Sequence, residues 1–393
     1  MKKIIFFSLS AMLILAVALS GCGGGSGSGG TGGGDNNGGG GTGDGGNNGG
    51  GGVITVTTVA GGGPDGQSFG DVDSNTGSGA RFRGPWGIAI ANGIIYIIDS
   101  SNYKIKKIEP ASGYKVTTIA GNGMDVSSDN PKGILASFAC PRGIAIAANG
   151  NIYVTESIAS HKIRMITAIA NYPVSTIAGS GTAGHTDDAT GTSATFNYPA
   201  GITLAGDDLY VAEAGPLLRK IGLTSPYRVD SIGSLGGYAL YDPAGVIVAN
   251  GAFYASNNSI YNQIVKIVPS TTSPGGYEAI ILAGGGSNGQ TSGSKDGIGT
   301  EALFYQPTAM AMDSNGNIYV VDSGNHKIRK INPATGQVTT IAGGGSDGKT
   351  PGSKDGTGAE ALFNRPCGIA IAADGSLYVT DSDNNKIRKI SFK

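Results

Sequence analysis

Residues 363–390, FNRPCGIAIAADGSLYVTDSDNNKIRKI, contain the pattern that decides the fold. A bulky apolar residue stands three positions before a proline and is followed by a short apolar run and a turn. A strand with a tyrosine, which usually ends in an acid, and a strand rich in Lys and Arg complete the pattern. Six copies occur, roughly 44 to 64 residues apart, with the prolines Pro85, Pro141, Pro199, Pro243, Pro307 and Pro366 and the tyrosines Tyr96, Tyr153, Tyr210, Tyr254, Tyr319 and Tyr378. Repeats of this size built from short strands are typical of a β-propeller with one blade per copy.

Each copy divides into four short strands. In the fifth copy, the predicted strands are 309–312, 317–322, 327–331 and 337–342, and they are separated by segments rich in Asn, Asp, Ser and Gly. These residues favour tight turns, and four antiparallel strands per copy make a propeller blade. We therefore predict an all-β fold.

The last copy lacks a fourth strand before Lys393. Its missing sequence is found at the other end of the domain, where residues 56–61 (VTTVAG) match residues 116–121 (VTTIAG) of the first copy. We predict that this N-terminal strand completes the C-terminal blade, since closure of the ring removes an exposed edge. The prediction is a six-bladed propeller over residues 53–393.

The segment 318–331, IYVVDSGNHKIRKI, together with the apolar run before it, resembles the NHL repeat. The resemblance extends to all six copies and is weakest in copies three and four. It implies a propeller that serves mostly as a binding platform, although relatives of this fold include lyases and lactonases.

The N-terminus has the features of a targeting segment. Lys2 and Lys3 precede an apolar stretch, residues 4–18, and residues 19–22 (LSGC) resemble a bacterial lipobox. The resemblance implies a lipoprotein signal peptide over residues 1–21 and lipidation of Cys22. An ordinary secretory signal with a chance cysteine is the alternative.

Residues 22–52 are almost entirely Gly with some Asn, Ser, Thr and Asp. Such a segment cannot bury apolar surface, so we predict a disordered tether between the lipid and the domain. The predicted location is the bacterial cell envelope. In a Gram-negative cell, Gly23 after the cysteine matches the outer-membrane sorting pattern.

Composition excludes some partners. The net charge is -1 and only 14% of the residues are charged, so no electrostatic attraction to nucleic acid or to an anionic membrane is expected. Three cysteines are too few for a disulfide framework. Cys140 and Cys367 lie in blades that are not adjacent, so we predict no disulfide between them.

Acids and bases recur together in the repeats. Copy four has Asn257 in place of the acid and Val265 in place of the base. Because an unpaired buried charge is costly, the joint loss of both partners predicts an ion pair within each blade rather than catalytic or metal-binding acids. The acids are Asp99, Glu156, Glu213, Asp322 and Asp381, and the bases are Lys106, Arg164, Arg219, Arg329 and Arg388.

Other repeated residues also favour structural roles. The apolar residues before the prolines are predicted to pack between neighbouring blades. They are Phe82, Phe138, Phe196, Leu240, Phe304 and Phe363.

No motif points to a metal, a cofactor or catalysis. His161, His185 and His326 lack a paired spacing for zinc. Residues 71–75 (DVDSN) begin like a calcium loop but lack its later Gly and Glu, so a turn rich in Asp and Asn is favoured. We expect no metal, no cofactor and no catalytic residue.

The residues that flank the prolines are predicted to surround the mouth of the central channel. Aromatic residues and arginines are the usual anchors of a binding patch, although these side chains could equally pack the loops onto the blades. The candidate patch consists of Trp86, Arg83, Arg142, Tyr198, Tyr241, Asp242, Tyr305 and Arg365. Long connections such as 121–140 are predicted to wall this face, with a notch at the short connection 236–242.

We therefore expect a lipid-anchored propeller that binds a protein, a glycan or a small ligand through its loop-rich face and performs no chemistry. Two alternatives remain open. One is a metal-dependent hydrolase or lyase of the lactonase kind, and the other is a structural subunit of an envelope complex. We expect a monomeric domain that contacts the membrane only through its lipid anchor.

Overall fold

The computed structural model describes residues 52–393, apart from residues 64, 216–217, 234, 236–237, 239, 241–242, 259, 274–275 and 346. The predicted signal peptide, Cys22, most of the tether, Tyr241 and Asp242 lie outside the described residues. The segment Val53–Lys393 forms one compact unit. Its described helices are all short, and none has the length and apolar character needed to cross a membrane.

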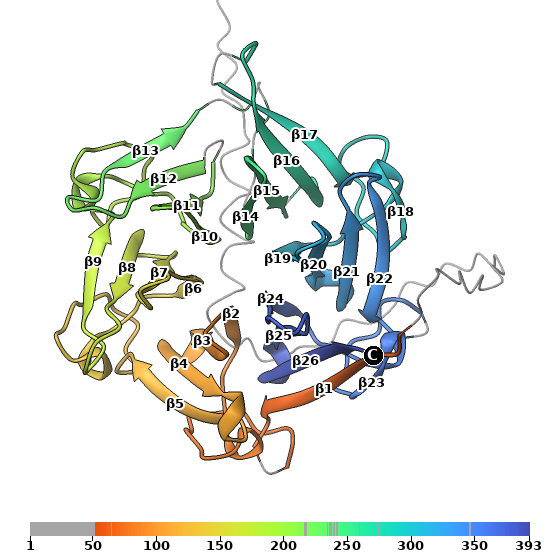
Figure 1. Cartoon of the computed structure of the whole chain (residues 1–393), viewed down its shortest axis with the longest axis horizontal. Coiled ribbons are helices and arrows are strands. Elements are labelled where there is room, and N and C mark those ends of the chain that lie inside the picture. The colour runs from red at the N-terminus through yellow and green to blue at the C-terminus, as the bar shows by residue number, and fades with distance from the viewer. Residues whose placement is uncertain are drawn as a thin grey trace, which may run out of the picture. The chain divides into compact units, whose positions relative to one another are not determined.

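Six antiparallel sheets surround a central axis, which confirms the predicted six-bladed propeller (Figure 1). Blade one comprises β2 (Pro85–Ala91), β3 (Ile94–Asp99), β4 (Lys104–Glu109) and β5 (Lys115–Ala120). Blade two comprises β6 (Pro141–Ile146), β7 (Ile152–Glu156), β8 (Lys162–Ile166) and β9 (Val174–Ala178). Blade three comprises β10 (Ile202–Ala205), β11 (Asp208–Ala212), β12 (Leu218–Gly222) and β13 (Val229–Ile232). Blade four comprises β14 (Val246–Ala249), β15 (Ala252–Asn257), β16 (Gln263–Pro269) and β17 (Tyr277–Gly284).

Blades five and six have a fifth, outer strand. Blade five comprises β18 (Gly297–Ile298), β19 (Pro307–Met312), β20 (Ile318–Asp322), β21 (Lys327–Asn332) and β22 (Gln337–Gly343). Blade six comprises β1 (Ile54–Gly61), β23 (Gly356–Thr357), β24 (Pro366–Ile371), β25 (Leu377–Asp381) and β26 (Lys386–Phe392). Short 3-10 turns connect the strands at η3 (Gly77–Gly79), η4 (Ser100–Asn102), η5 (Pro110–Ser112), η6 (Gly133–Leu135), η7 (Gly191–Ser193), η8 (Gly299–Glu301), η9 (Ser323–Asn325), η10 (Gly358–Glu360) and η11 (Ser382–Asn384).

The ring closes as predicted. Strand β1 pairs antiparallel with β26, with Ile54 opposite Phe392 and Thr58 opposite Arg388. The two ends of the domain therefore share one sheet, which supplies the fourth strand that the last repeat lacks.

The residues before the prolines pack between blades. Phe196 is fully buried among Ile163 and Ile177 of blade two and Leu209 and Val211 of blade three. The other members of the set are equally buried: Phe82, Phe138, Phe304 and Phe363 at 0% exposure and Leu240 at 1%. Each such side chain contributes about 1.5–3 kcal/mol by burial, so the six together hold the blades in contact.

The long connections lie partly along the outer edges of the blades. Asn130, in the connection before blade two, exchanges main-chain hydrogen bonds with Val174 on the outer strand β9. The strands β18 and β23 do the same in blades five and six. Part of each connection therefore covers a sheet edge, which sequence analysis did not anticipate. The predicted notch includes residues outside the described part of the chain.

Candidate functional site

At the start of each blade, one residue stands between the proline of the repeat and a small residue. This ring of equivalent positions is Trp86, Arg142, Ala200, Ala244, Thr308 and Cys367. Two of its neighbouring members, Trp86 and Arg142, have large side chains, whereas Ala200 and Ala244 are small. The mouth of the channel is therefore asymmetric, with bulk on one side and room on the other.

Blade-to-blade hydrogen bonds position both large residues. The carbonyl of Trp86 accepts a hydrogen bond from Thr380 Oγ1 of blade six at 2.7 Å. The carbonyl of Pro141, beside Arg142, accepts one from Ser100 Oγ of blade one at 2.9 Å. Gly87 is required for this closeness, because a Cβ there would lie 2.4 Å from the carbonyl oxygen of Arg142.

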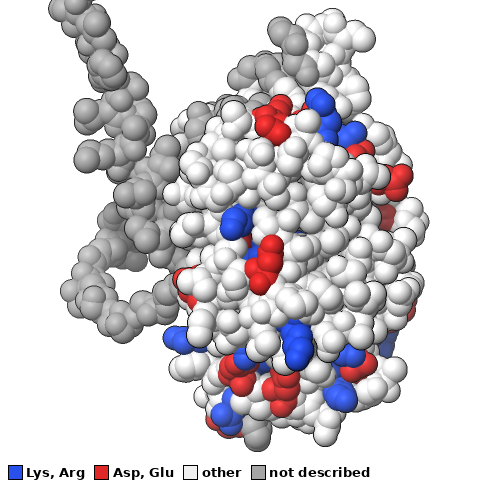
Figure 2. All heavy atoms as spheres, turned by 90° about the vertical axis from the view of Figure 1, so that its left-hand side faces the viewer, with Lys and Arg blue, Asp and Glu red and all other residues white. Residues whose placement is uncertain are grey.

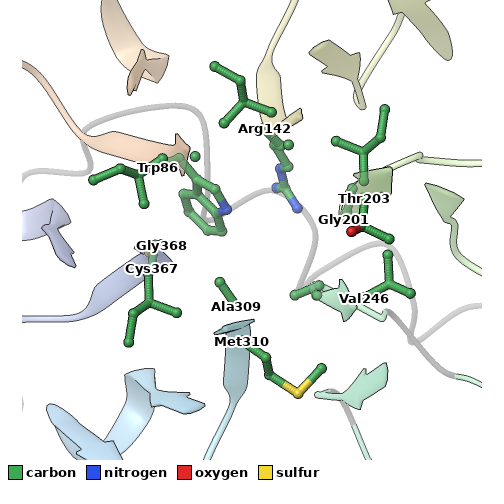
Figure 3. A pocket seen from close by; sticks show the side chains of 18 of the residues that line it. Trp86, Arg142, Gly201, Thr203, Val246, Ala309, Met310, Cys367 and Gly368 are labelled. Atoms are coloured by element: carbon green, nitrogen blue, oxygen red, sulfur yellow. The ribbon is translucent and has the colours of Figure 1, made fainter. Parts of the chain in front are cut away.

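The Arg142 guanidinium lies over the Trp86 ring, with its carbon 5.0 Å from the ring centroid. Both side chains border a cavity of about 140 Å³ at the centre of the ring (Figure 3). Apart from Thr203 and Cys367, the rest of the wall is apolar or glycine, including Ile144, Val246 and Met310. A cation held against an aromatic ring in such surroundings is suited to an anionic ligand.

Cys367 also lines this cavity and is a free, buried thiol. Burial raises the pKa of Cys367 to about 12, so the thiol is neutral at physiological pH. A neutral thiol is a poor nucleophile, and Cys367 contributes to the shape of the cavity rather than to its charge.

The other described members of the predicted patch lie outside the central cavity. Arg83 and Arg365 are exposed, and the Arg83 guanidinium lies over the Phe69 ring at 5.8 Å. Tyr198 meets the His161 ring edge-on, with centroids 5.0 Å apart. Tyr305 is 44% exposed. These four do not line the central cavity, and whether any of them takes part in binding remains a prediction.

The predicted ion pairs are confirmed. The inner acids and the bases are fully buried and paired, as for Arg329 and Asp322 at 2.7 Å and Arg388 and Asp381 at 2.6 Å. Burial raises the pKa of Asp381 to about 6, and the nearby Arg388 opposes this shift. In blade one, Lys106 lies 3.9 Å from Asp99, and burial raises the pKa of Asp99 to about 7.

Sequence analysis missed a second, outer acid in the same five blades. Asp296 bonds Arg329 at 2.6 Å and also the main-chain N–H and hydroxyl of Thr340 on the outer strand. The equivalent acids are Asp73, Asp129, Asp187 and Asp355. Each outer acid lies eight or nine residues before the apolar residue that precedes the proline, and this spacing was the available signal. Residues 71–75 are thus part of a structural network, because Asp71 and Asp73 bind Lys106.

Blade four replaces this network with neutral groups. Tyr238 donates to Gln263 Oε1 and accepts a hydrogen bond from Asn257 Nδ2. The joint loss of acid and base in this blade is therefore compensated by a hydrogen-bonded network, which avoids an unpaired charge.

Among the described residues, no group of three or more His, Cys, Asp or Glu side chains is placed to hold a metal ion. Charges of both signs are interspersed on the face that Figure 2 shows, and uncharged residues dominate it.

The comparisons with known proteins agree with this architecture. The family model described as the Teneurin NHL domain matches residues 250–391. NHL repeat-containing protein 2 of Homo sapiens is 26% identical over 340 residues, which cover 80% of this chain and 40% of that protein. Protein SUPPRESSOR OF QUENCHING 1, chloroplastic, of Arabidopsis thaliana is 28% identical over 334 residues, which cover 79% of this chain and 30% of that protein. The match thus spans less than half the length of these relatives.

Solved structures share the fold at low identity. An auxiliary nutrient binding protein from Bacteroides ovatus superposes with a TM-score of 0.66 at 16% identity, covering 87% of this chain and 77% of the other. A streptogramin B lyase superposes with a TM-score of 0.51 at 16% identity, covering 87% and 98%. The repeats, the ring of six blades and these matches together support an NHL-repeat β-propeller.

Proposed function

We propose that this chain is a non-catalytic binding module that takes a compact anionic ligand at the mouth of its central channel. The proposal depends on one observation, the Arg142 guanidinium stacked 5.0 Å from the centroid of the Trp86 ring at the border of a cavity. Arginine binds carboxylates and phosphates through two parallel hydrogen bonds, and an indole face packs against an apolar ring. A ligand with an acidic group and a flat face, such as an acidic saccharide, matches both.

The proposed site is held by the fold rather than by mobile loops. Hydrogen bonds between blades fix the main chain of Trp86 and of Pro141, which precedes Arg142, so little conformational entropy is lost on binding. The likeness to an auxiliary nutrient binding protein is a fold likeness and is compatible with a binding role.

We further propose that the domain is tethered to the bacterial cell envelope. The lipobox-like residues 19–22 and the glycine-rich residues 23–52 support this proposal. Lipid chains on Cys22 would provide a stable anchor, and a glycine-rich segment of this length would separate the domain from the lipid by about 30 Å. Radiolabelled palmitate incorporated into the wild-type chain, but not into C22S, is the expected result.

Trp86 is the only tryptophan in the sequence, so intrinsic fluorescence reports on the proposed site directly. We expect glucuronate oligosaccharides to change the fluorescence saturably, and neutral glucose oligosaccharides of equal length to have little effect. R142A should weaken binding about 10- to 100-fold, which corresponds to losing a charged hydrogen-bond pair. R83A is the matched control, because Arg83 is exposed and does not line the cavity.

The proposed site would be wrong if carboxylate, phosphate and sulfate ligands all left the Trp86 fluorescence unchanged. Equal loss of affinity in R83A and R142A would place the ligand elsewhere on the loop face. The alternative of a metal-dependent lyase or hydrolase predicts that calcium or zinc raises the melting temperature by mass action. The alternative of a structural subunit predicts stoichiometric partners in a pull-down with the anchor intact.

A further inference from the structure

The central cavity extends unequally into the ring of blades. Around the ring, most of the residues that line it stand one to three positions after the proline of the repeat. Among the described residues, only Thr203 of blade three and Ile247 of blade four line it from the fourth position. Because a strand rises about 3.3 Å per residue, this position lies about 10 Å further along the innermost strand than the ring at the mouth. Blades three and four therefore form the deep end of the cavity.

The mouth directs a ligand towards this deep end. Its two small residues, Ala200 and Ala244, belong to the same two blades, whereas Trp86 and Arg142 belong to blades one and two. A ligand that enters beside the large side chains passes over the small ones, so its leading end meets Thr203. A cavity of about 150 Å³ can hold one benzene ring, so the volume of about 140 Å³ found here matches a single six-membered ring.

Thr203 is an exception among the six copies of the repeat. The equivalent residues are alanine in four copies and isoleucine in one, namely Ala89, Ala145, Ala311, Ala370 and Ile247. Thr155 and Thr308, on other strands, use their hydroxyls to bond carbonyl groups of the next blade. Within the described part of the chain, no protein group bonds the hydroxyl of Thr203, which pairs with Tyr210 only through the sheet register. The fold therefore does not depend on this hydroxyl.

The position of the Thr203 hydroxyl suits ligand recognition. Figure 3 shows its oxygen turned towards the cavity, and the neighbouring lining residues Ile202, Val246 and Ile247 are apolar. A hydroxyl both donates and accepts hydrogen bonds, whereas the guanidinium of Arg142 only donates. A ligand with an apolar group at this end would remove the hydroxyl from water without giving it a partner, which is unfavourable.

We propose that Thr203 is a specificity-determining residue of the candidate site and selects acids that carry a hydroxyl group on the end that enters the channel. This inference rests on the proposed function, because it concerns the same cavity. Arg142 holds the acidic group near the mouth, and Thr203 bonds the hydroxyl at the deep end. A sugar acid meets both residues, whereas an acid without hydroxyls meets only Arg142.

Titration of the Trp86 fluorescence with two acids tests this inference. D-Glucuronate and cyclohexanecarboxylate both have a six-membered ring and a carboxylate, but only glucuronate has hydroxyls. T203V preserves the shape of the side chain and removes its hydroxyl. Glucuronate should therefore bind T203V about 3- to 10-fold more weakly than the wild type, and cyclohexanecarboxylate should bind it no more weakly.

Two further variants are controls. T203S keeps a hydroxyl, so its affinity for glucuronate should stay within about twofold of the wild-type value. T224V makes the same chemical change at Thr224, which is exposed in a turn of the same blade and does not line the cavity, so it should bind both acids as the wild type does.

The outcomes separate this inference from the proposed function. Equal weakening of both acids in T203V would indicate an effect of shape and would overturn the role of the hydroxyl, as would an unchanged affinity for glucuronate. If neither acid changes the fluorescence of the wild type, the site and the role of Thr203 are both wrong. If T203V discriminates between the acids while R142A binds both normally, Thr203 keeps its role and Arg142 is not the anchor of the acid.

Discussion

The imidazole of His326 accepts a hydrogen bond at Nδ1 from the main-chain N–H of Arg365, at 3.0 Å. His326 ends the turn before the third strand of blade five, and Arg365 precedes the proline of blade six. His161 makes the same contact with Tyr198 at 3.2 Å. In two other blades, Asn262 and Asn385 accept the equivalent bonds through Oδ1, from Gln306 and Gly84. The two histidines therefore connect neighbouring blades through hydrogen bonds.

The free energy of unfolding should fall in acid because these two histidine hydrogen bonds are lost. Burial lowers the pKa values of His161 and His326 below their ordinary value, and the nearby Arg365 lowers that of His326 further. The stabilising contribution is thus present above the pKa of the unfolded chain, near 6.5, and is lost as pH falls through the lower pKa of the folded state. Protonated imidazole has no acceptor at Nδ1, so each bond loses about 0.5–1.5 kcal/mol.

Urea unfolding at neutral and mildly acidic pH measures this effect. The double variant H161N/H326N is a matched control, because Asn accepts the same bond in blades four and six and tolerates the left-handed backbone found here. Its stability should change less with pH than that of the wild type. Identical pH profiles for the two proteins would contradict the role of the histidines.

Lys106→Arg should stabilise the protein by about 1 kcal/mol. Arginine reaches the inner and the outer acid at once, whereas Lys106 binds Asp71 and Asp73 and remains 3.9 Å from Asp99. Because the pKa of Asp99 is raised to about 7, the wild type should lose stability as pH rises through that value. K106R should reduce this loss. Thermal melts across this pH range measure both effects, and R329K should shift stability in the opposite direction.

Asp355→Ala should open the closure of the ring. Asp355 bonds Arg388 at 2.7 Å and both the main-chain N–H and the hydroxyl of Thr58 on β1 at 2.9 Å. Removing it leaves a buried guanidinium with one partner fewer, so we expect a loss of about 2–3 kcal/mol and faster proteolysis near β1.

Asp374→Ala is the control for that experiment. The Asp374 side chain is 60% exposed and lies 3.5 Å from Lys389 in the same blade. Exposed pairs contribute little, so its unfolding free energy should stay within about 1 kcal/mol of the wild-type value. Similar losses in D355A and D374A would show that Asp355 has no special role in closure.

Gly368→Ala should disturb both stability and the candidate site. A Cβ at Gly368 would lie 2.2 Å from the carbonyl oxygen of Trp86, so blades six and one would have to separate. We expect a loss of several kcal/mol and a shifted Trp86 emission. Ala309 holds the equivalent position in blade five, and A309G should be nearly neutral in both measurements. An unchanged emission in G368A would show that this contact does not position Trp86.

The sequence by itself determined the blade number, the ring closure, the buried apolar residues before the prolines and the pairing of inner acids with bases. The repeat itself occurs six times, so each position could be compared with its equivalents, and the joint absence of charge at Asn257 and Val265 in one copy indicated the ion pairs in the other five. Only the tertiary structure decided what the outer acids bind, the hydrogen bonds that His161 and His326 accept across blades, and the contact between Trp86 and Arg142. These contacts join segments far apart in the chain or in different blades, and side chains such as Trp86 and Arg142 occur in one copy each. The spacing of the repeats alone does not show which residues meet, because the packing of the blades determines those contacts.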